Sequence, residues 1–282
     1  MRYTMKATLT AIVVGGALGV ATLQAAYAPD VHLTEAQQAP ARKGAAAMKA
    51  LNKGMREAII AEKLALLFSE NGRPAYSGAL ANTKDTNKHY FLVLTGARFV
   101  GSDGTVKEYE QFLPAGRDRK KLPASAAKVY KAMEALGDEA ILAAFADEAT
   151  ALCKEAAKYH LMQLDSTMRA AVLADMAGLL TLPNGASPYK GESVNNVNGT
   201  LTPLTLRTVA NKTKFFDAKG AMHDYASTIR KGDAEMRRWR SRMQALWCAQ
   251  LIGNDDVLEL FADEVAEIRR HTEAYEPPVT AE

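Results

Sequence analysis

The chain has 282 residues, of which 48% are hydrophobic and 24% are charged, and this globular composition excludes wholesale disorder. The formal net charge of +3 excludes the large positive excess of a protein that coats nucleic acid. Aromatic residues make up only 7% of the chain and alanine is abundant, so we expect a mainly α fold built as a bundle of packed helices.

The N-terminal segment has the pattern of an export signal or a membrane anchor. Arg2 and Lys6 precede residues 7–29, which contain no charged side chain. Ala26-Tyr27-Ala28 is the small-x-small pattern that a signal peptidase reads. We therefore expect residues 1–28 to be a signal peptide or an anchor, and the protein to be exported or membrane-anchored.

Two alternatives for this segment stay open. Pro29 directly after the small-x-small pattern disfavours cleavage, and an uncleaved stretch from residue 7 to 29 is long enough to cross a bilayer. The other alternative is a cytoplasmic protein whose translation starts at Met48.

Residues 29–50 combine Ala, Gln, Pro and basic residues without apolar periodicity, so we expect a linker. A helical domain over residues 51–181 follows, and its first helix is predicted over residues 51–68. Apolar residues at helical spacing carry this prediction. They are Ile60, Leu64 and Leu67.

A β insertion is expected within this domain, at residues 89–113. Residues 89–95 and 97–100 are rich in aromatic and β-branched side chains, and residues 101–104 (GSDG) have turn chemistry. Residues 105–113 then return as a third strand. We therefore predict a small three-stranded β-meander.

The rest of the domain, residues 123–181, is predicted to hold three helices separated at Gly137 and Asp165. A heptad-like apolar spacing marks one packing surface. Its residues are Phe145, Ala149, Leu152, Ala156 and Tyr159. Residues 182–205 are rich in Pro, Gly and Asn, and we expect a long loop that is either mobile or functional.

A C-terminal helical hairpin is predicted over residues 206–276. Apolar residues at alternating three- and four-residue steps indicate one long helix over residues 218–251. They are Met222, Tyr225, Ile229, Gly232, Met236, Trp239, Met243 and Leu246. Gly253 ends this helix, and Asp256 with Glu259 has the spacing of a capping box for the last helix.

Residue patterns for catalysis are missing from the sequence. We find no phosphate-binding glycine loop, no nucleophile elbow and no paired metal-binding histidines, so we expect no catalytic residue, no metal and no cofactor. Cys153 and Cys248 are too few for a disulfide framework. We expect buried thiols, with one disulfide between them as the alternative in an exported chain.

Basic residues on the predicted long helix are the candidate binding surface. Lys231, Arg238 and Arg242 lie on one side of that helix, away from the apolar seam, and Arg237 is beside them. They either pair with the acidic last helix or contact a polyanion such as nucleic acid or anionic lipid. The interaction seam itself would pack within the fold or against a protein partner or second copy. Its residues are Met236, Trp239, Met243 and Leu246.

Two stretches resemble a known family. Residues 51–60 (LNKGMREAII) look like the opening of phage proteins of the fifth nucleotide-modification-associated domain type. Residues 247–264 resemble the ending of that family, which has a long charged helix, a break and a terminal helix. The resemblance implies a link to phage DNA modification and transfers no catalytic residue.

We therefore expect a non-catalytic helical binding or scaffold protein, exported or membrane-tethered. Its membrane contact would come only through the N-terminal segment, and a basic helix would contact a polyanion. A cytoplasmic phage accessory factor of nucleotide modification is the alternative function, and an enzyme without a recognisable motif ranks third.

Overall fold

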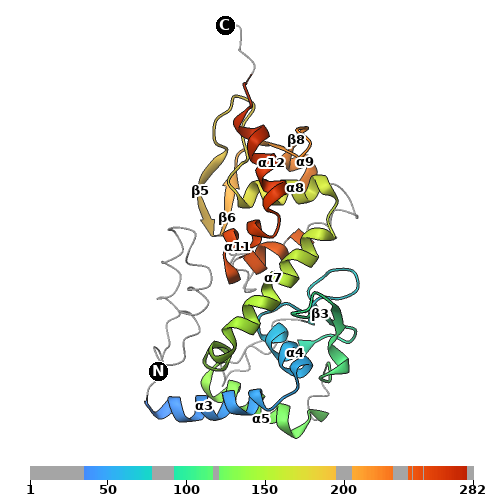
Figure 1. The fold of residues 1–282 in the computed structure, drawn as a ribbon, viewed down its shortest axis with the longest axis vertical. Coiled ribbons are helices and arrows are strands. Elements are labelled where there is room, and N and C mark those ends of the chain that lie inside the picture. The colour runs from blue at the N-terminus through green and yellow to red at the C-terminus, as the bar shows by residue number, and fades with distance from the viewer. Residues whose placement is uncertain are drawn as a thin grey trace.

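Helices dominate the part of the chain that the computed structural model describes, namely residues 35–77, 92–116, 121–194, 205–230, 241–242, 244–249 and 251–277 (Figure 1). The expected mainly α fold is confirmed. Across these ranges the strands form only two-stranded antiparallel sheets. The same ranges contain no helix with both the length and the apolar character that crossing a membrane requires. The expected signal or anchor, residues 1–28, lies outside them.

The first part of the chain forms a helical layer with two small sheets beside it. In chain order its elements are α3 (Glu35–Lys49), α4 (Lys53–Lys63), β1 (Tyr76–Ser77), β2 (Leu92–Val93), β3 (Arg98–Val100), β4 (Val106–Glu108), η1 (Tyr109–Gln111), α5 (Ala124–Leu136), α6 (Asp138–Leu142), η3 (Ala143–Phe145) and α7 (Ala146–Met162). Helix α3 packs against α5, while α4 and β3 pack against α7.

The second part repeats this order of elements. It contains α8 (Ser166–Met176), β5 (Tyr189–Val194), β6 (Thr205–Val209), β7 (Lys214–Phe216), β8 (Met222–Asp224), α9 (Tyr225–Arg230), α11 (Asn254–Glu259) and α12 (Ala262–Glu273). Helical residues at 241–242, 244–249 and 251–252, here named the Trp247 helix, precede α11. Helix α7 runs between the two parts (Figure 1).

The repetition is visible in the amino-acid sequence itself. Residues 52–77 align without a gap with residues 165–190, and residues 92–109 align with 208–225. Residues 137–148 align with 253–264 and share the letters FADE. Identical pairs include Met55/Met168, Arg56/Arg169, Leu66/Leu179, Leu67/Leu180, Gly72/Gly185, Tyr76/Tyr189, Phe99/Phe215, Gly104/Gly220, Tyr109/Tyr225 and Gly137/Gly253. The chain is therefore a tandem of two related units.

Aligned residues make the same contacts in both units. The Asn52 side chain accepts a hydrogen bond from the Met55 N–H at 2.9 Å as the N-cap of α4, and Asp165 caps α8 through the Met168 N–H at 2.8 Å. Such caps stabilise a helix by about 1 kcal/mol.

The aligned tyrosines also play the same part. The Tyr76 hydroxyl accepts from the Leu67 N–H at 3.2 Å, and the Tyr189 hydroxyl accepts from the Leu180 N–H at 3.3 Å. Each unit thus fixes the turn after its first capped helix with a tyrosine from its first hairpin.

Helix α7 belongs to both units, so the first unit passes into the second without a linker. Its beginning aligns with α12, and in each case a glutamate pairs with the arginine of the capped helix. The Arg56 Nε–Glu148 Oε2 distance is 3.1 Å, and the Arg169 Nε–Glu264 Oε2 distance is 2.8 Å. The later residues of α7 align with α3 and supply the first helix of the second unit.

Contacts from the second unit reach the end of α4 in the first. The Trp247 indole N–H donates to the Leu64 carbonyl oxygen at 2.8 Å, and the Gln244 amide donates to the Ala65 carbonyl oxygen at 3.2 Å. These donors satisfy carbonyl groups that a helix C-terminus leaves without an intrahelical partner.

The linker expected at residues 29–50 is wrong over residues 35–49, which form α3. The buried side of α3 consists of the small or flexible residues Ala41, Gly44 and Met48. Gly44 permits a close approach, because a Cβ at this position would lie 2.5 Å from Ile141 Cδ1 and 2.8 Å from Ala132 Cβ. Apolar periodicity based on large side chains does not detect this packing face, because small residues form most of it.

The expected three-stranded meander at residues 89–113 is also wrong. The turn at residues 101–104 does connect β3 to β4, with Phe99 opposite Lys107. However, β2 pairs with the distant β1, where Val93 lies opposite Tyr76, and not with β3. The segment therefore contributes to two separate sheets.

The boundaries predicted for the C-terminal half need several corrections. The expected loop at residues 182–205 contains β5, and the expected helical hairpin at 206–276 begins with strands β6 to β8. Met222 lies in β8, so the predicted long helix does not start at residue 218. The last helix is split into α11 and α12, and the N-cap of α11 is Gly253 rather than Asp256.

Candidate functional site

Arg242, a predicted polyanion contact, is buried in the second unit with a side chain only 4% exposed. Its Nη2 atom donates to Asp175 Oδ2 at 3.1 Å and to the Tyr225 hydroxyl at 2.6 Å. The Tyr225 hydroxyl also donates to Asp175. These three residues, here named the arginine lock, join α8, α9 and the Trp247 helix, so the prediction of an exposed Arg242 is wrong.

A different cluster occupies the aligned place in the first unit. Glu62 aligns with Asp175 and Tyr109 with Tyr225, and the Tyr109 hydroxyl donates to Glu62 Oε2 at 2.6 Å. The residue that aligns with Arg242 is Ala126. A second phenol takes part instead, because Tyr130 also donates to Glu62 Oε2. We name Glu62, Tyr109 and Tyr130 the tyrosine lock.

Both locks have the chemistry of structural ties. Burial, together with the charge of Glu62, raises the pKa of Tyr130 well above its ordinary value. Burial likewise raises the pKa of Tyr225 against the opposing effect of Arg242. Phenols with raised pKa values keep their protons at neutral pH, so they act here as hydrogen-bond donors and not as acids or bases.

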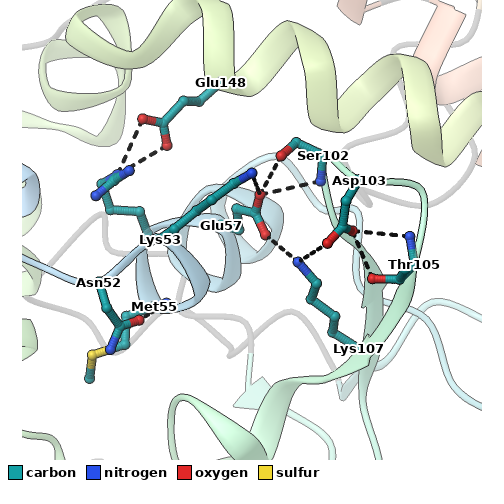
Figure 2. A network of polar contacts seen from close by, with 10 residues as sticks. Asn52, Lys53, Met55, Glu57, Ser102, Asp103, Thr105, Lys107 and Glu148 are labelled. Atoms are coloured by element: carbon teal, nitrogen blue, oxygen red, sulfur yellow. Dashed lines mark hydrogen bonds and ion pairs between the residues drawn. The ribbon is translucent and has the colours of Figure 1, made fainter.

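A third polar cluster ties α4 to the turn between β3 and β4 (Figure 2). Glu57, whose side chain is 1% exposed, accepts from Lys107 Nζ at 2.8 Å and from Ser102 Oγ at 2.5 Å. Asp103 accepts from the Thr105 hydroxyl at 2.7 Å and lies 3.1 Å from Lys107 Nζ. The carboxylates of Glu57 and Asp103 therefore both contact the ammonium group of Lys107.

The charges of this cluster are fixed at neutral pH. Burial alone would raise the pKa of Glu57, but hydrogen bonds from Lys107 and Ser102 outweigh burial and lower it. Burial alone would lower the pKa of Lys107, but the bonds to Glu57 and Asp103 outweigh it and raise the pKa. Neither group is poised for proton transfer, and the cluster serves to hold the turn on α4.

A cavity of about 680 Å³ opens where α3, α4 and the start of α7 meet. Lys49 and Arg56 line it together with Asp147 and Glu148, over a small apolar wall that includes Ala143 and Ala144. The aligned residues in the second unit are the larger Glu259 and Leu260. Because the lining carries equal numbers of cations and carboxylates, its charge favours neither an anion nor a cation.

Most of the predicted interaction residues lie outside the described part of the chain. This applies to Lys231, Arg237, Arg238, Met236, Trp239 and Met243. Leu246, the remaining seam residue, is buried in the Trp247 helix. The predicted contacts with a polyanion or a partner therefore stay predictions from the sequence. Only the predicted exposure of Arg242 is contradicted.

Cys153 and Cys248 are both buried and free in the structure. Burial raises the pKa of Cys248 to about 12, and it raises that of Cys153 well above the ordinary thiol value. Both groups are therefore protonated and unreactive at neutral pH. In the described ranges no group of three or more His, Cys, Asp or Glu residues is placed to hold a metal ion.

Nothing among protein-family models, curated proteins or solved structures matches the chain. The resemblance of residues 51–60 and 247–264 to the phage family therefore stays a prediction. In the structure, residues 51–60 comprise the N-cap and most of α4, and their aligned counterpart is the capped helix α8.

The two locks were missed in the sequence interpretation, although the chain carries a signal for them. The alignment of residues 52–77 with 165–190 requires no gap, and it pairs Glu62 with Asp175 directly. Self-similarity of this kind needs only the order of the amino acids, so the sequence by itself is enough to reveal the tandem.

Proposed function

We propose that the protein is a non-catalytic binding scaffold, exported or tethered to a membrane, which presents surfaces of a rigid two-unit body to its partners. Support comes from what the two units have in common. The shared contacts are helix caps, the tyrosine behind each turn, the arginine–glutamate pair and the carboxylate–tyrosine lock. These contacts hold a fold together, as the repeated residues of tandem-repeat binding proteins do.

The observation that carries this proposal is the sharing of α7. Because one helix ends the first unit and begins the second, the units are joined by a packed helix and not by a flexible linker. Lys154 of α7 also pairs with Asp256 of α11 at 2.6 Å. A body of this kind holds distant surfaces at a fixed separation, which suits a protein that brings partners together.

Contact with a polyanion through Lys231, Arg237 and Arg238 is part of the proposal. Arg242 is left out of this set, because reversing a buried charge would damage the fold. Each phosphate contact on duplex DNA contributes a log–log salt slope of about −0.9. We expect replacement of all three residues by Gln to remove the binding while thermal stability stays unchanged.

The proposal is tested by light scattering over a tenfold range of protein concentration, together with gel shifts on duplex DNA at two salt concentrations. Concentration-dependent self-association or salt-sensitive DNA binding that the triple variant loses supports a binding scaffold. A protein that stays monomeric at all concentrations and binds no DNA at low salt contradicts both self-association and polyanion binding as modes of the scaffold.

A further inference from the structure

The packed pair α3–α5 forms a basic surface at one end of the molecule. Five cations of these helices are exposed to solvent. They are Arg42, Lys43, Lys49, Lys128 and Lys131. The acidic residues on the same two helices are Glu35 and Glu134, so positive charge prevails. Figure 1 shows α3 and α5 side by side below the rest of the molecule.

Within the described part of the chain none of these five cations pairs with a carboxylate. By contrast, Lys63 pairs with Asp138 at 3.2 Å, and Lys107 pairs with Glu57 at 2.8 Å. Because five exposed cations outnumber the two carboxylates of α3 and α5, these helices give this surface a positive potential.

The opposite end of the molecule carries the opposite charge. Exposed carboxylates predominate on α11 and α12. They are Asp255, Glu259, Asp263, Glu267 and Glu273. Helix α12 lies towards the far end of the view from α3 (Figure 1). The molecule is therefore polarised along its length, so an anionic surface attracts one end and repels the other.

The sequence before α3 indicates which kind of anion this end meets. Helix α3 begins at Glu35, only a few residues after the uncharged stretch at residues 7–29. In a chain held by that stretch, the basic helices lie next to the bilayer. Basic residues beside a membrane-inserted segment bind anionic lipid headgroups.

We propose that the exposed cations of α3 and α5 form a docking surface for a bilayer that contains anionic lipids, with α12 directed away from it. This inference rests on the proposed membrane tether and adds a binding surface to it. Its residues are different from those of the polyanion segment at residues 231–238.

The test measures how the full chain partitions onto vesicles of phosphatidylcholine alone and of phosphatidylcholine with phosphatidylglycerol. The uncharged N-terminal stretch contributes to both, so the ratio of the two partition coefficients isolates the charge-dependent part. The test variant combines Lys128→Gln with Lys131→Gln. The control combines Lys219→Gln with Arg269→Gln, two exposed cations of the second unit that also form no ion pair within the described residues.

Each basic residue near an anionic surface strengthens partitioning about fivefold, so the test variant should lower the ratio about 25-fold. The control variant has the same net charge as the test variant and should leave the ratio unchanged. Wild-type binding should also weaken between 0.1 M and 1 M salt, where the screening length falls from about 10 Å to about 3 Å.

Three results overturn this inference. One is equal loss in both variants, which would indicate a response to net charge alone. Another is anionic binding that persists in the test variant but disappears when Lys231, Arg237 and Arg238 are replaced. That result would leave the proposed polyanion segment intact while refuting the α3–α5 surface. The third is a gel shift of duplex DNA that depends on Lys128 and Lys131 without any preference for anionic vesicles.

Discussion

The two units solve the same problem, a buried carboxylate, in different ways. In the second unit Asp175 faces the guanidinium of Arg242, whereas in the first unit Glu62 accepts hydrogen bonds from two phenols, Tyr109 and Tyr130. An ion pair binds two opposite charges that are each costly to bury alone. The tyrosine lock contains one carboxylate that accepts from two phenols, so the loss of one phenol leaves a second hydrogen bond in place. We therefore expect the second unit to be far more sensitive to the loss of one partner.

Asp175→Asn should have the largest effect of the changes considered. It removes the charge of the carboxylate that lies 3.1 Å from the buried Arg242 guanidinium, and breaking a buried pair in this way costs about 3–5 kcal/mol. Urea unfolding followed by circular dichroism measures the loss. A cost below that of the equivalent change in the first unit would contradict the assignment of the two locks.

His160 offers a second comparison, because the aligned residue of α3 is Ala47. Burial lowers the pKa of His160 to about 3, against an ordinary value near 6.5. Below pH 6.5 His160 therefore binds a proton in the unfolded chain but stays neutral in the folded chain. As a result, the free energy of unfolding falls as the pH drops from 6.5 towards 3. Between pH 7 and pH 5 this residue should cost about 2 kcal/mol.

The measurement is the free energy of unfolding at both pH values for the wild type and for His160→Leu. The variant should lose less stability on acidification, since its side chain does not titrate. An identical pH dependence in the two proteins would show that His160 is protonated or accessible in the fold.

Gly44 and Ala157 are aligned positions on α3 and α7, and the units differ in how closely a helix approaches there. Gly44→Ala places a Cβ within 3 Å of both Ile141 and Ala132, an overpacking that costs about 1–3 kcal/mol. A gain of about 1 kcal/mol in helix propensity partly offsets this cost. Ala157→Gly is the matched control and should cost about 1 kcal/mol through helix propensity, to which the loss of a buried methyl group adds about 0.8 kcal/mol. Thermal unfolding compares the two, and a Gly44→Ala variant more stable than the wild type would contradict the close packing of α3.

Glu62→Gln should have the smallest effect of the series, about 1 kcal/mol, because the amide oxygen still accepts from the tyrosines. The same urea titration gives its free energy of unfolding. A loss as large as that of Asp175→Asn would mean that the charge of Glu62, and not its hydrogen bonding, holds the tyrosine lock together.

The sequence predicts local features of this fold well and long-range ones poorly. The helix breaks at Gly137 and Asp165 and the turn at residues 101–104 follow from residue chemistry at those positions, and the structure confirms them. The pairing of β2 with β1 depends on residues far apart in the chain, so periodicity within one segment carried no information about it.

The error at Arg242 has the same physical origin. Counting heptads placed this residue off the apolar seam and thus on the surface, but its partners Asp175 and Tyr225 come from other elements. A charge can be buried wherever a distant carboxylate compensates it, and no pattern within a single helix reveals that carboxylate. The alignment of the two halves pairs Asp175 with Glu62 and Tyr225 with Tyr109, so it indicates that Asp175 and Tyr225 belong to one repeated cluster.

Hydrogen exchange on Asp175→Asn tests most directly whether the chain is a tandem of two separately locked units. The account predicts faster exchange in α8, α11 and α12, with protection retained in α3 and α5, since each unit depends on its own lock. Uniformly faster exchange across both units, with α3 and α5 losing protection as much as α12, would contradict it.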